Sequence, residues 1–396
     1  MAGMMLDTYA RRIGTLQKRI ADSGLSGAII GTGAELAYLT GSWSTSHERL
    51  TALVVPPVGY ARLFAPATDA SAVVEVGDIP GVVVETWRDG NETYDRIADL
   101  LADGPVALGS SLTADHVLRL QMAGEIGETV LANDVLSDVF AVKEPEEIAE
   151  LEKAAHAIDA VHAAVPDLLV AGSTERDVAD EIAQLILKEH ATVDFVIVGS
   201  GPNGANPHHD FSDRVLQSGE PVVVDIGGSL ASGYHSDCTR TYAVESMPDR
   251  AVLAAYEELR AAQLEALSTA RPGMTAGELD AVARGRINQA GYGVNFSHRL
   301  GHGIGLALHE PPFLVSGSDT VLQEGMVFSI EPGIYVDGQW GMRIEDIVVL
   351  EANGARPLNL APKNLLGEKS LIHIIGRHDT PRQPTRRNAS SPRCHE

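Results

Sequence analysis

Carboxylate side chains follow apolar, strand-like runs at four places in the second half of the sequence. Asp225 stands in PVVVDIGG, Asp237 in GYHSDCTRTYAV, Glu331 in MVFSIEPGIY and Glu345 in GMRIEDIVVL. Asp225 and Glu331 directly follow residues that we expect to be buried, where a lone carboxylate is costly unless a cation neutralises it. Oxygen ligands joined by an imidazole suit Mn²⁺, Co²⁺ or Zn²⁺. These segments therefore predict a metal centre.

Two glycine-containing turns can bring the acids together in pairs. The turn GGSLASGY joins the first pair, and YVDGQWG, with the hairpin dipeptide Asp337-Gly338, joins the second. The glycine-rich segment GHGIGLALHEPP adds His302 and His309. We expect His302 to be the nitrogen ligand, in a loop whose glycines allow the backbone to come close.

Each of these residues also has a common structural alternative. An isolated Asp at a strand end more often caps a turn, a single Glu is usually solvated, and a lone His usually satisfies a local hydrogen bond. The combination of several such residues in one part of the chain favours the metal site over these alternatives.

Residues 1–140 are predicted to form a small α/β domain. Helical spacing of Tyr9, Ile13, Leu16 and Ile20 is followed by short apolar runs that alternate with helical patterns. These runs are GAII, TALVV, ARLFA, GVVVETW and PVALG. Alternation of this kind predicts a sheet covered by helices.

A second domain is predicted over residues 145–370, opening on the amphipathic run AVKEPEEIAELEKAAHAIDAVH. Inside it, AGSTERDVADEI and PGMTAGELDAVA look alike. Each has a Thr and an acid in the capping-box spacing that begins a helix, Thr174 with Asp177 and Thr275 with Glu278. The match indicates two similar αβ halves with a cleft between them, and a chance match is the alternative.

The amino-acid composition excludes some classes of binding partner and indicates the compartment. The 396 residues include 30 basic and 54 acidic ones, a formal charge of −24 that argues against nucleic acid and anionic membranes as partners. No signal peptide and no apolar run of spanning length is visible. Only Cys238 and Cys394 occur, so no disulfide framework is indicated and we expect a cytoplasmic protein. Residues 377–396 are polar and aperiodic, which predicts a disordered tail.

The segments VVVDIG, YHSDCTRT, GHGIGLALHE, FSIEPGIY and RIEDIV, in this order, resemble the pita-bread metallopeptidases, the family of methionine aminopeptidase, aminopeptidase P and prolidase. The resemblance implies an α/β (α+β) chain whose pita-bread catalytic domain binds two divalent metal ions, Mn²⁺ first, with Co²⁺ or Zn²⁺ as alternatives. The implied ligands are Asp225, Asp237, His302, Glu331 and Glu345. In the family pattern Asp237 and Glu345 bridge both ions, Asp225 belongs to one, and His302 and Glu331 belong to the other.

The same resemblance implies catalytic roles. Glu331 would be the general base, and His208 and His309 would contact the substrate carbonyl and the developing oxyanion. His209, the neighbour of His208, fits this position less well. Arg343 matches a substrate-site arginine of the Xaa-Pro branch, and a surface ion pair is its alternative role.

An N-terminal domain of this size resembles that of the Xaa-Pro enzymes. It implies hydrolysis of Xaa-Pro bonds at the N-terminus of dipeptides or short peptides, by a homodimer. His47 and Arg49 could bind a dipeptide's carboxylate, or could be surface loop residues. The alternative functions are a small-molecule hydrolase or lyase on the same metal centre, a metal-free creatinase-like amidinohydrolase, and a binding module that has lost the chemistry.

Overall fold

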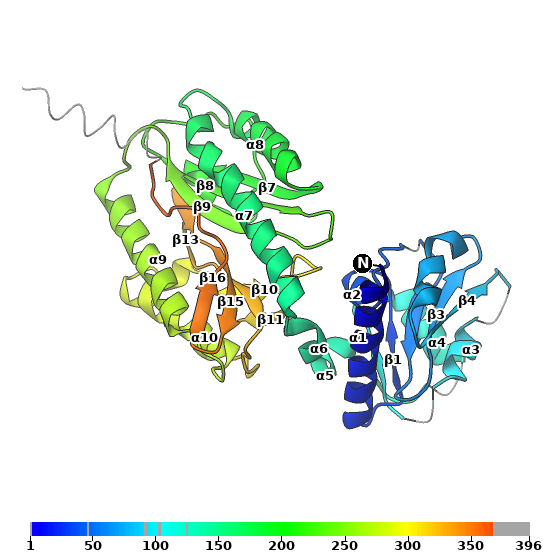
Figure 1. Ribbon diagram of the computed structural model, residues 1–396. Coiled ribbons are helices and arrows are strands. Elements are labelled where there is room, and N and C mark those ends of the chain that lie inside the picture. The colour runs from blue at the N-terminus through cyan, green and yellow to red at the C-terminus, as the bar shows by residue number, and fades with distance from the viewer. Residues whose placement is uncertain (1, 46, 91–92, 102–103, 124–125, 367–396) are drawn as a thin grey trace, which may run out of the picture.

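Two bodies, joined near α6 and the start of α7, make up the protein in this computed structural model (Figure 1). The predicted tail at 377–396 and the end of the second predicted domain lie outside the described part of the chain. The structure describes residues 2–45, 47–90, 93–101, 104–123 and 126–366.

The first body is built on one mixed sheet with the strand order β4-β3-β2-β1-β5-β6, in which β5 is parallel to both β1 and β6. The strands are β1 (Gly27–Ile30), β2 (Ala52–Val55), β3 (Ala61–Pro66), β4 (Val82–Trp87), β5 (Val106–Leu108) and β6 (Thr129–Leu131). The helices are α1 (Ala2–Asp22), α2 (Ala34–Thr40), α3 (Thr93–Ala98), α4 (Ala114–Ala123), α5 (Ala132–Val135) and α6 (Ser137–Ala141). Two 3-10 turns, η1 (Ala70–Ala72) and η2 (Val74–Asp78), precede β4.

Helices cover both faces of this sheet, as Figure 1 shows. The stripe of α1 that includes Leu16 packs against Ala28 and Ile30 of β1, whereas Ile29 faces the other side, toward α3 and α4. This alternation follows from the two-residue period of a strand. All five predicted strands form. The unpredicted β6 has only three residues, none of them fully buried, and its short apolar segment Val130-Leu131 is too brief to indicate a strand.

The described part of the second body, residues 145–366, contains four long helices and three sheets. Its helices are α7 (Pro145–Leu168), α8 (Glu175–Glu189), α9 (Arg250–Thr269) and α10 (Ala276–Gln289), with 3-10 turns η3 (Gly201–Ala205) and η4 (Gly293–Asn295). One sheet has the order β7-β8-β9, from β7 (Thr192–Ser200), β8 (Pro221–Ser229) and β9 (Cys238–Ala243). A second has the order β11-β10-β12-β15-β16, from β10 (Gly301–Gly303), β11 (Glu310–Leu314), β12 (Val327–Ile330), β15 (Asp346–Glu351) and β16 (Gly354–Pro357). The hairpin of β13 (Gly333–Val336) and β14 (Trp340–Arg343) is the third.

The second body consists of two similar halves, as predicted. Thr174 caps α8 and Thr275 caps α10, each in a complete capping box. The segment before each helix also pairs in the same way, since Thr174 bridges Val215 and Thr275 bridges Val321. In each half two helices cover a sheet, α7 and α8 over β7 to β9, and α9 and α10 over the sheet of β12 and β15. The predicted mixed fold with two αβ halves is therefore confirmed.

The first hairpin differs from its prediction in one respect. Asp225 lies in the middle of β8, because this strand continues through Gly227 and Gly228 to Ser229. A Cβ at Gly227 would collide with the ring of Phe195 on the neighbouring strand. These glycines therefore permit close strand packing, and only the residues after them form the turn.

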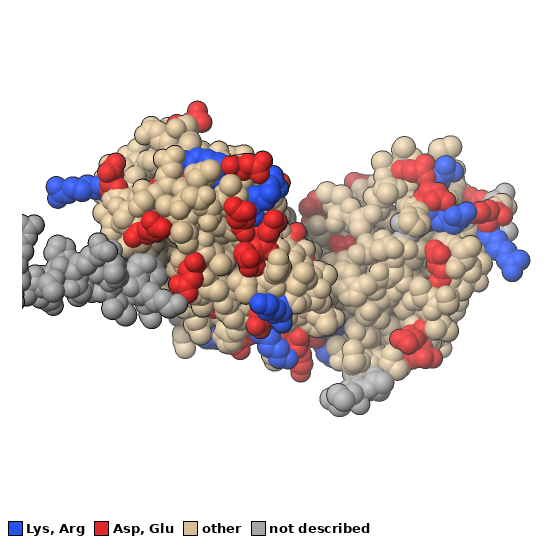
Figure 2. Space-filling view, turned by 90° about the horizontal axis from the view of Figure 1, so that it is seen from above, with Lys and Arg blue, Asp and Glu red and all other residues tan. Residues whose placement is uncertain are grey.

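The surface reflects the acidic composition. Figure 2 shows acidic side chains spread over both bodies on one face, with basic side chains among them. None of the helices in the described ranges has the length and apolar content that a membrane span requires.

Candidate active site

The two halves bring the predicted ligand residues to one place. Asp225 projects from β8 and Asp237 directly precedes β9, while His302 lies in β10. Glu331 follows β12, and Glu345 stands between β14 and β15. Donor atoms lie within 4.8 Å of one another in three overlapping groups, and these groups are Asp225 with Asp237 and Glu345, His302 with Glu331 and Glu345, and Asp237 with His302 and His309.

The buried carboxylates of this cluster repel one another, so full ionisation of the cluster is costly. Burial, with the neighbouring carboxylates as the second cause, raises the pKa values of Asp237 and Glu345 well above their ordinary range. Burial also raises the pKa of Glu331 to about 7. One oxygen each of Asp225 and Glu345 is buried without a hydrogen-bond partner. These residues fit divalent metal ions, which would supply the missing positive charge.

His302 has the protonation state that a nitrogen ligand of a metal ion requires. Its Nδ1 lies 3.1 Å from the carbonyl oxygen of Gly303, so this nitrogen carries the proton and Nε2 carries the lone pair. Nε2 lies 3.6 Å from Asp237 and 3.3 Å from Glu331. Burial lowers the pKa of His302 to about 3, which keeps the ring neutral as metal ligation requires.

A cavity of about 610 Å³ opens over this cluster. Its lining includes all five predicted ligand residues and the predicted substrate residues His208, His309 and Arg343. The remaining lining comes from Phe195, Pro207, His298, Arg299 and Leu308. His47 and Arg49 are absent from the lining, and Arg49 pairs with Asp89 and Glu48 on the surface. Their surface-loop alternative is therefore the one that fits.

The two adjacent histidines of the loop after η3 have different environments. His208 is exposed and lines the cavity. His209 turns away, and its Nε2 lies 2.9 Å from Oε2 of Glu175. The geometry therefore favours His208 as the substrate contact.

Glu175, the first residue of α8, accepts hydrogen bonds from residues on both sides of this loop. It is fully buried, and one oxygen accepts hydrogen bonds from the amide and hydroxyl of Ser200, at 2.8 and 2.6 Å. The other accepts from the amide and hydroxyl of Ser212, at 2.9 and 2.6 Å. Although burial opposes ionisation, these hydrogen bonds lower the pKa of Glu175. The chain on both sides of His208 is thus anchored to one carboxylate.

Glu175→Ala should therefore impair catalysis from a distance. We expect kcat/KM to fall roughly 100-fold because His208 loses its fixed position, with metal content unchanged. His208→Ala added to Glu175→Ala should cost little more, since both act through one interaction. Asp213→Asn, an exposed acid at the end of the same loop, is the control. Full additivity of the two losses would contradict this role.

His309 lies beside the ligand cluster but is more exposed than the predicted ligands. Its ring centroid is 4.1 Å from that of His302, in an edge-on arrangement. Burial, with the charge of Arg299 as the second cause, lowers the pKa of His309. A neutral imidazole at this position can donate one hydrogen bond to a substrate oxygen.

Arg343 is buried, so the alternative of a surface pair does not apply to it. Nη2 lies 2.5 Å from Oδ2 of Asp225, and Nη1 donates to the Tyr335 hydroxyl at 2.7 Å. Nε donates to Thr239, whose hydroxyl in turn donates to Glu345 at 2.8 Å. Arg343 therefore orients two of the acids, and its guanidinium reaches the wall of the cavity.

Tyr335, His298 and Arg299 are among the lining or supporting residues that were not predicted from the sequence. Tyr335 bonds to His298 at 2.9 Å as well as to Arg343. Arg299 stacks 4.5 Å from the ring centroid of Phe313, and no ion pair of its guanidinium occurs among the described residues. A signal was present for two of them, because SHRLGHG places His298 and Arg299 just before His302.

The raised pKa of Glu331 predicts how the stability of the metal-free protein changes with pH. Folding raises the pKa of Glu331 from 4.5 to about 7, so in this interval the folded state binds more protons than the unfolded state. The associated stability is present at low pH and is lost as the pH rises through that interval. Urea unfolding in a chelator should show metal-free wild type falling relative to metal-free Glu331→Gln. A rise over the same interval would contradict the prediction.

The fold and the site together define the class. Two similar αβ halves hold buried carboxylates and a neutral histidine around one cavity, behind an N-terminal α/β body, which is the arrangement of a pita-bread metallopeptidase. Residues 149–352 match metallopeptidase family M24, and residues 12–139 match the creatinase/prolidase N-terminal domain. The chain belongs to metallopeptidase family M24, and the expectation from the motifs is confirmed.

Relatives cover nearly the whole described chain. A "Probable dipeptidase PepE" of Mycobacterium tuberculosis is 48% identical over 365 residues, which are 91% of this chain and 96% of that protein. A Xaa-Pro dipeptidase of Lactobacillus helveticus is 36% identical over 366 residues, covering 88% and 97%. The crystal structure of dipeptidase PepE from Mycobacterium ulcerans superposes with a TM-score of 0.88 at 46% identity, covering 91% and 98%.

Proposed function

We propose that this metallopeptidase hydrolyses Xaa-Pro dipeptides, with two divalent metal ions bound by Asp225, Asp237, His302, Glu331 and Glu345. The observation that carries the proposal is the convergence of these residues, with unpartnered carboxylate oxygens, on one cavity. Relatives named dipeptidase and Xaa-Pro dipeptidase support the substrate class. The presence of every ligand residue argues against a metal-free creatinase-like enzyme. We further propose Mn²⁺ as the first ion to test, and a cytoplasmic homodimer.

The metal ions and the chain's own residues would act together in hydrolysis. When bound, the ions would polarise the peptide carbonyl and lower the pKa of water. Glu331, which accepts a hydrogen bond from the Ser329 hydroxyl at 3.0 Å, would take a proton from water and return it to the leaving nitrogen. His208 and His309 would donate hydrogen bonds to the carbonyl oxygen and the developing oxyanion, each contributing about 3 kcal/mol.

The position of Arg299 favours dipeptides over longer peptides as substrates. A dipeptide ends in a carboxylate close to the cleaved bond, and burying that charge requires a cation. Arg343 is already paired with Asp225, whereas Arg299 lines the same cavity with its guanidinium unpaired in the described chain. We propose that Arg299 binds the terminal carboxylate of the substrate.

A peptide panel tests the function. Protein loaded with Mn²⁺, Co²⁺ or Zn²⁺ would be assayed for proline release from Ala-Pro and Met-Pro and for cleavage of Ala-Pro-Ala. We expect higher kcat/KM for the dipeptides than for the tripeptide. Bound metal without any proline release would overturn the proposal and favour a small-molecule hydrolase or lyase.

Arg299→Ala tests the carboxylate contact. Loss of a charged hydrogen bond should raise KM for Ala-Pro about 10- to 100-fold with a smaller change in kcat. Ala-Pro-amide, which lacks the charge, should respond little to the same substitution. Arg260→Ala, on the exposed face of α9, is the matched control. Equal losses on Ala-Pro and its amide would exclude this role.

A further inference from the structure

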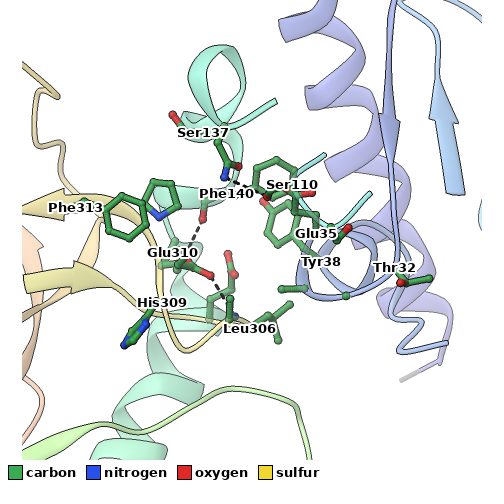
Figure 3. Close-up of a pocket in the computed structure, with 18 residues that line it drawn as sticks. Thr32, Glu35, Tyr38, Ser110, Ser137, Phe140, Leu306, His309, Glu310 and Phe313 are labelled. Carbon is green, nitrogen blue, oxygen red and sulfur yellow. Dashed lines mark hydrogen bonds and ion pairs between the residues drawn. The ribbon is translucent and has the colours of Figure 1, made fainter. Parts of the chain in front are cut away.

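A second cavity, of about 200 Å³, lies between the two bodies (Figure 3). On one side it is lined by the loops that follow β1 and β5, at residues 32–33 and 110–111, and by Asn133 after β6. On the other side it meets residues 306–307 and 309–311 of the second body. In open α/β sheets, ligands bind outside the carboxyl ends of parallel strands, and this cavity occupies that position.

Glu35 is the unsatisfied group of this cavity. It lies on α2 and lines the cavity, and its Oε2 is buried without a hydrogen-bond partner. Burial, with the charge of Glu310 as the second cause, raises the pKa of Glu35 to about 7. Glu147 and Glu310 line the cavity as well, and Glu147 is already paired with Arg12 and Tyr234. A carboxylate without a partner beside these charges calls for a positive charge.

No basic side chain among the described residues pairs with Glu35. Lys143 lines the cavity but is committed to Glu310, and it also donates to the Phe140 carbonyl at 2.7 Å. Glu310 in turn accepts from the amide of Ala307 at 3.3 Å, which ties this ion pair to the loop of the second body. Within the described part of the chain, Glu35 is thus left without a cation.

The rest of the lining indicates what such a cation would carry. Hydroxyl and amide groups gather beside Glu35, with Asn133 Nδ2 donating to the Ser110 hydroxyl at 3.3 Å. The apolar side of the cavity is formed by Tyr38, Phe140, Leu306 and Phe313, which Figure 3 shows around the same space. A cavity with apolar walls and a few convergent polar groups is the usual form of a small-molecule site.

We propose that this cavity binds a small aliphatic ammonium compound, with its charged nitrogen against Glu35 and a second polar group at Ser110, Ser111 and Asn133. This ligand is separate from the peptide substrate, and the proposal does not depend on the Xaa-Pro specificity. His309 lines both cavities, so the ligand would lie on the other side of this residue from the metal centre.

A matched pair of probes tests the proposal. 4-Amino-1-butanol carries one ammonium and one hydroxyl, and 1,4-butanediol has the same size without charge. Calorimetric titration of the metal-loaded protein at about pH 8, where Glu35 is ionised, should show binding of the amine and none of the diol. Glu35→Gln should weaken binding of the amine at least about tenfold, because the charge is lost with little change in shape.

Two further variants complete the experiment. Glu35→Ala, which removes the charge and enlarges the cavity, should lose the amine as Glu35→Gln does. Glu75→Gln removes an exposed acid from the same body and should bind the amine as wild type does. If wild type does not bind the amine at millimolar concentration, or if Glu35→Gln binds it equally, the proposal is wrong. Equal binding would place the amine elsewhere, including at the metal centre.

Discussion

Asp237→Ala should abolish metal binding and peptide hydrolysis together, and Glu345→Ala should do the same. Both side chains are buried in the middle of the ligand cluster, and each belongs to two of the groups of closely spaced donor atoms. Removing either leaves neither proposed metal position complete. The loss of metal affinity and activity should exceed the roughly 10- to 100-fold loss seen when a residue that hydrogen-bonds to a metal ligand is substituted. Metal analysis after dialysis and the Ala-Pro assay measure the two effects.

Stability separates this loss from misfolding. In metal-free protein, Asp237 repels Glu345, Asp225 and Glu331, so the neutral variant Asp237→Asn should be at least as stable as wild type in a chelator. Added Mn²⁺ should raise the Tm of wild type and leave that of the variant unchanged. Asp213→Asn, an exposed acid of the same body, should behave as wild type in both respects. Metal retained by Asp237→Ala would remove this residue from the ligand set.

His309→Ala should slow turnover strongly while the metal ions stay bound. Loss of one hydrogen bond to the developing oxyanion costs about 100- to 1,000-fold in kcat, and KM should change less. The structure makes this test informative, because a His309 nitrogen also lies close to Asp237 and His302. Metal content measured beside kcat distinguishes a substrate contact from a ligand.

The control for this variant is His156→Ala, on the exposed side of α7. It should leave both kcat and metal content at the wild-type level. A large drop in metal content for His309→Ala would assign this residue to the metal centre instead of the substrate. Retained metal with unchanged kcat would deny it both roles.

Local sequence patterns predicted much of the fold and of the candidate metal centre. A capping box needs only Thr174 and Asp177, and a strand run such as VVVDIG shows its carboxylate directly, because backbone geometry links residues that are close in the chain. The extent of β8 was misjudged because glycines are ambiguous. Gly227 is read as a turn residue until Phe195 is known to lie against it.

Contacts between distant segments were decided only by the tertiary structure. The sequence by itself determined the residue types of the candidate metal centre, their order and the two similar halves. Only the folded chain showed that Glu175 anchors His209, that Arg343 pairs with Asp225, and that Glu35 is left without a partner between the two bodies. Side-chain pairing and burial depend on which surfaces meet, and segments far apart in the sequence carry no local pattern that records this.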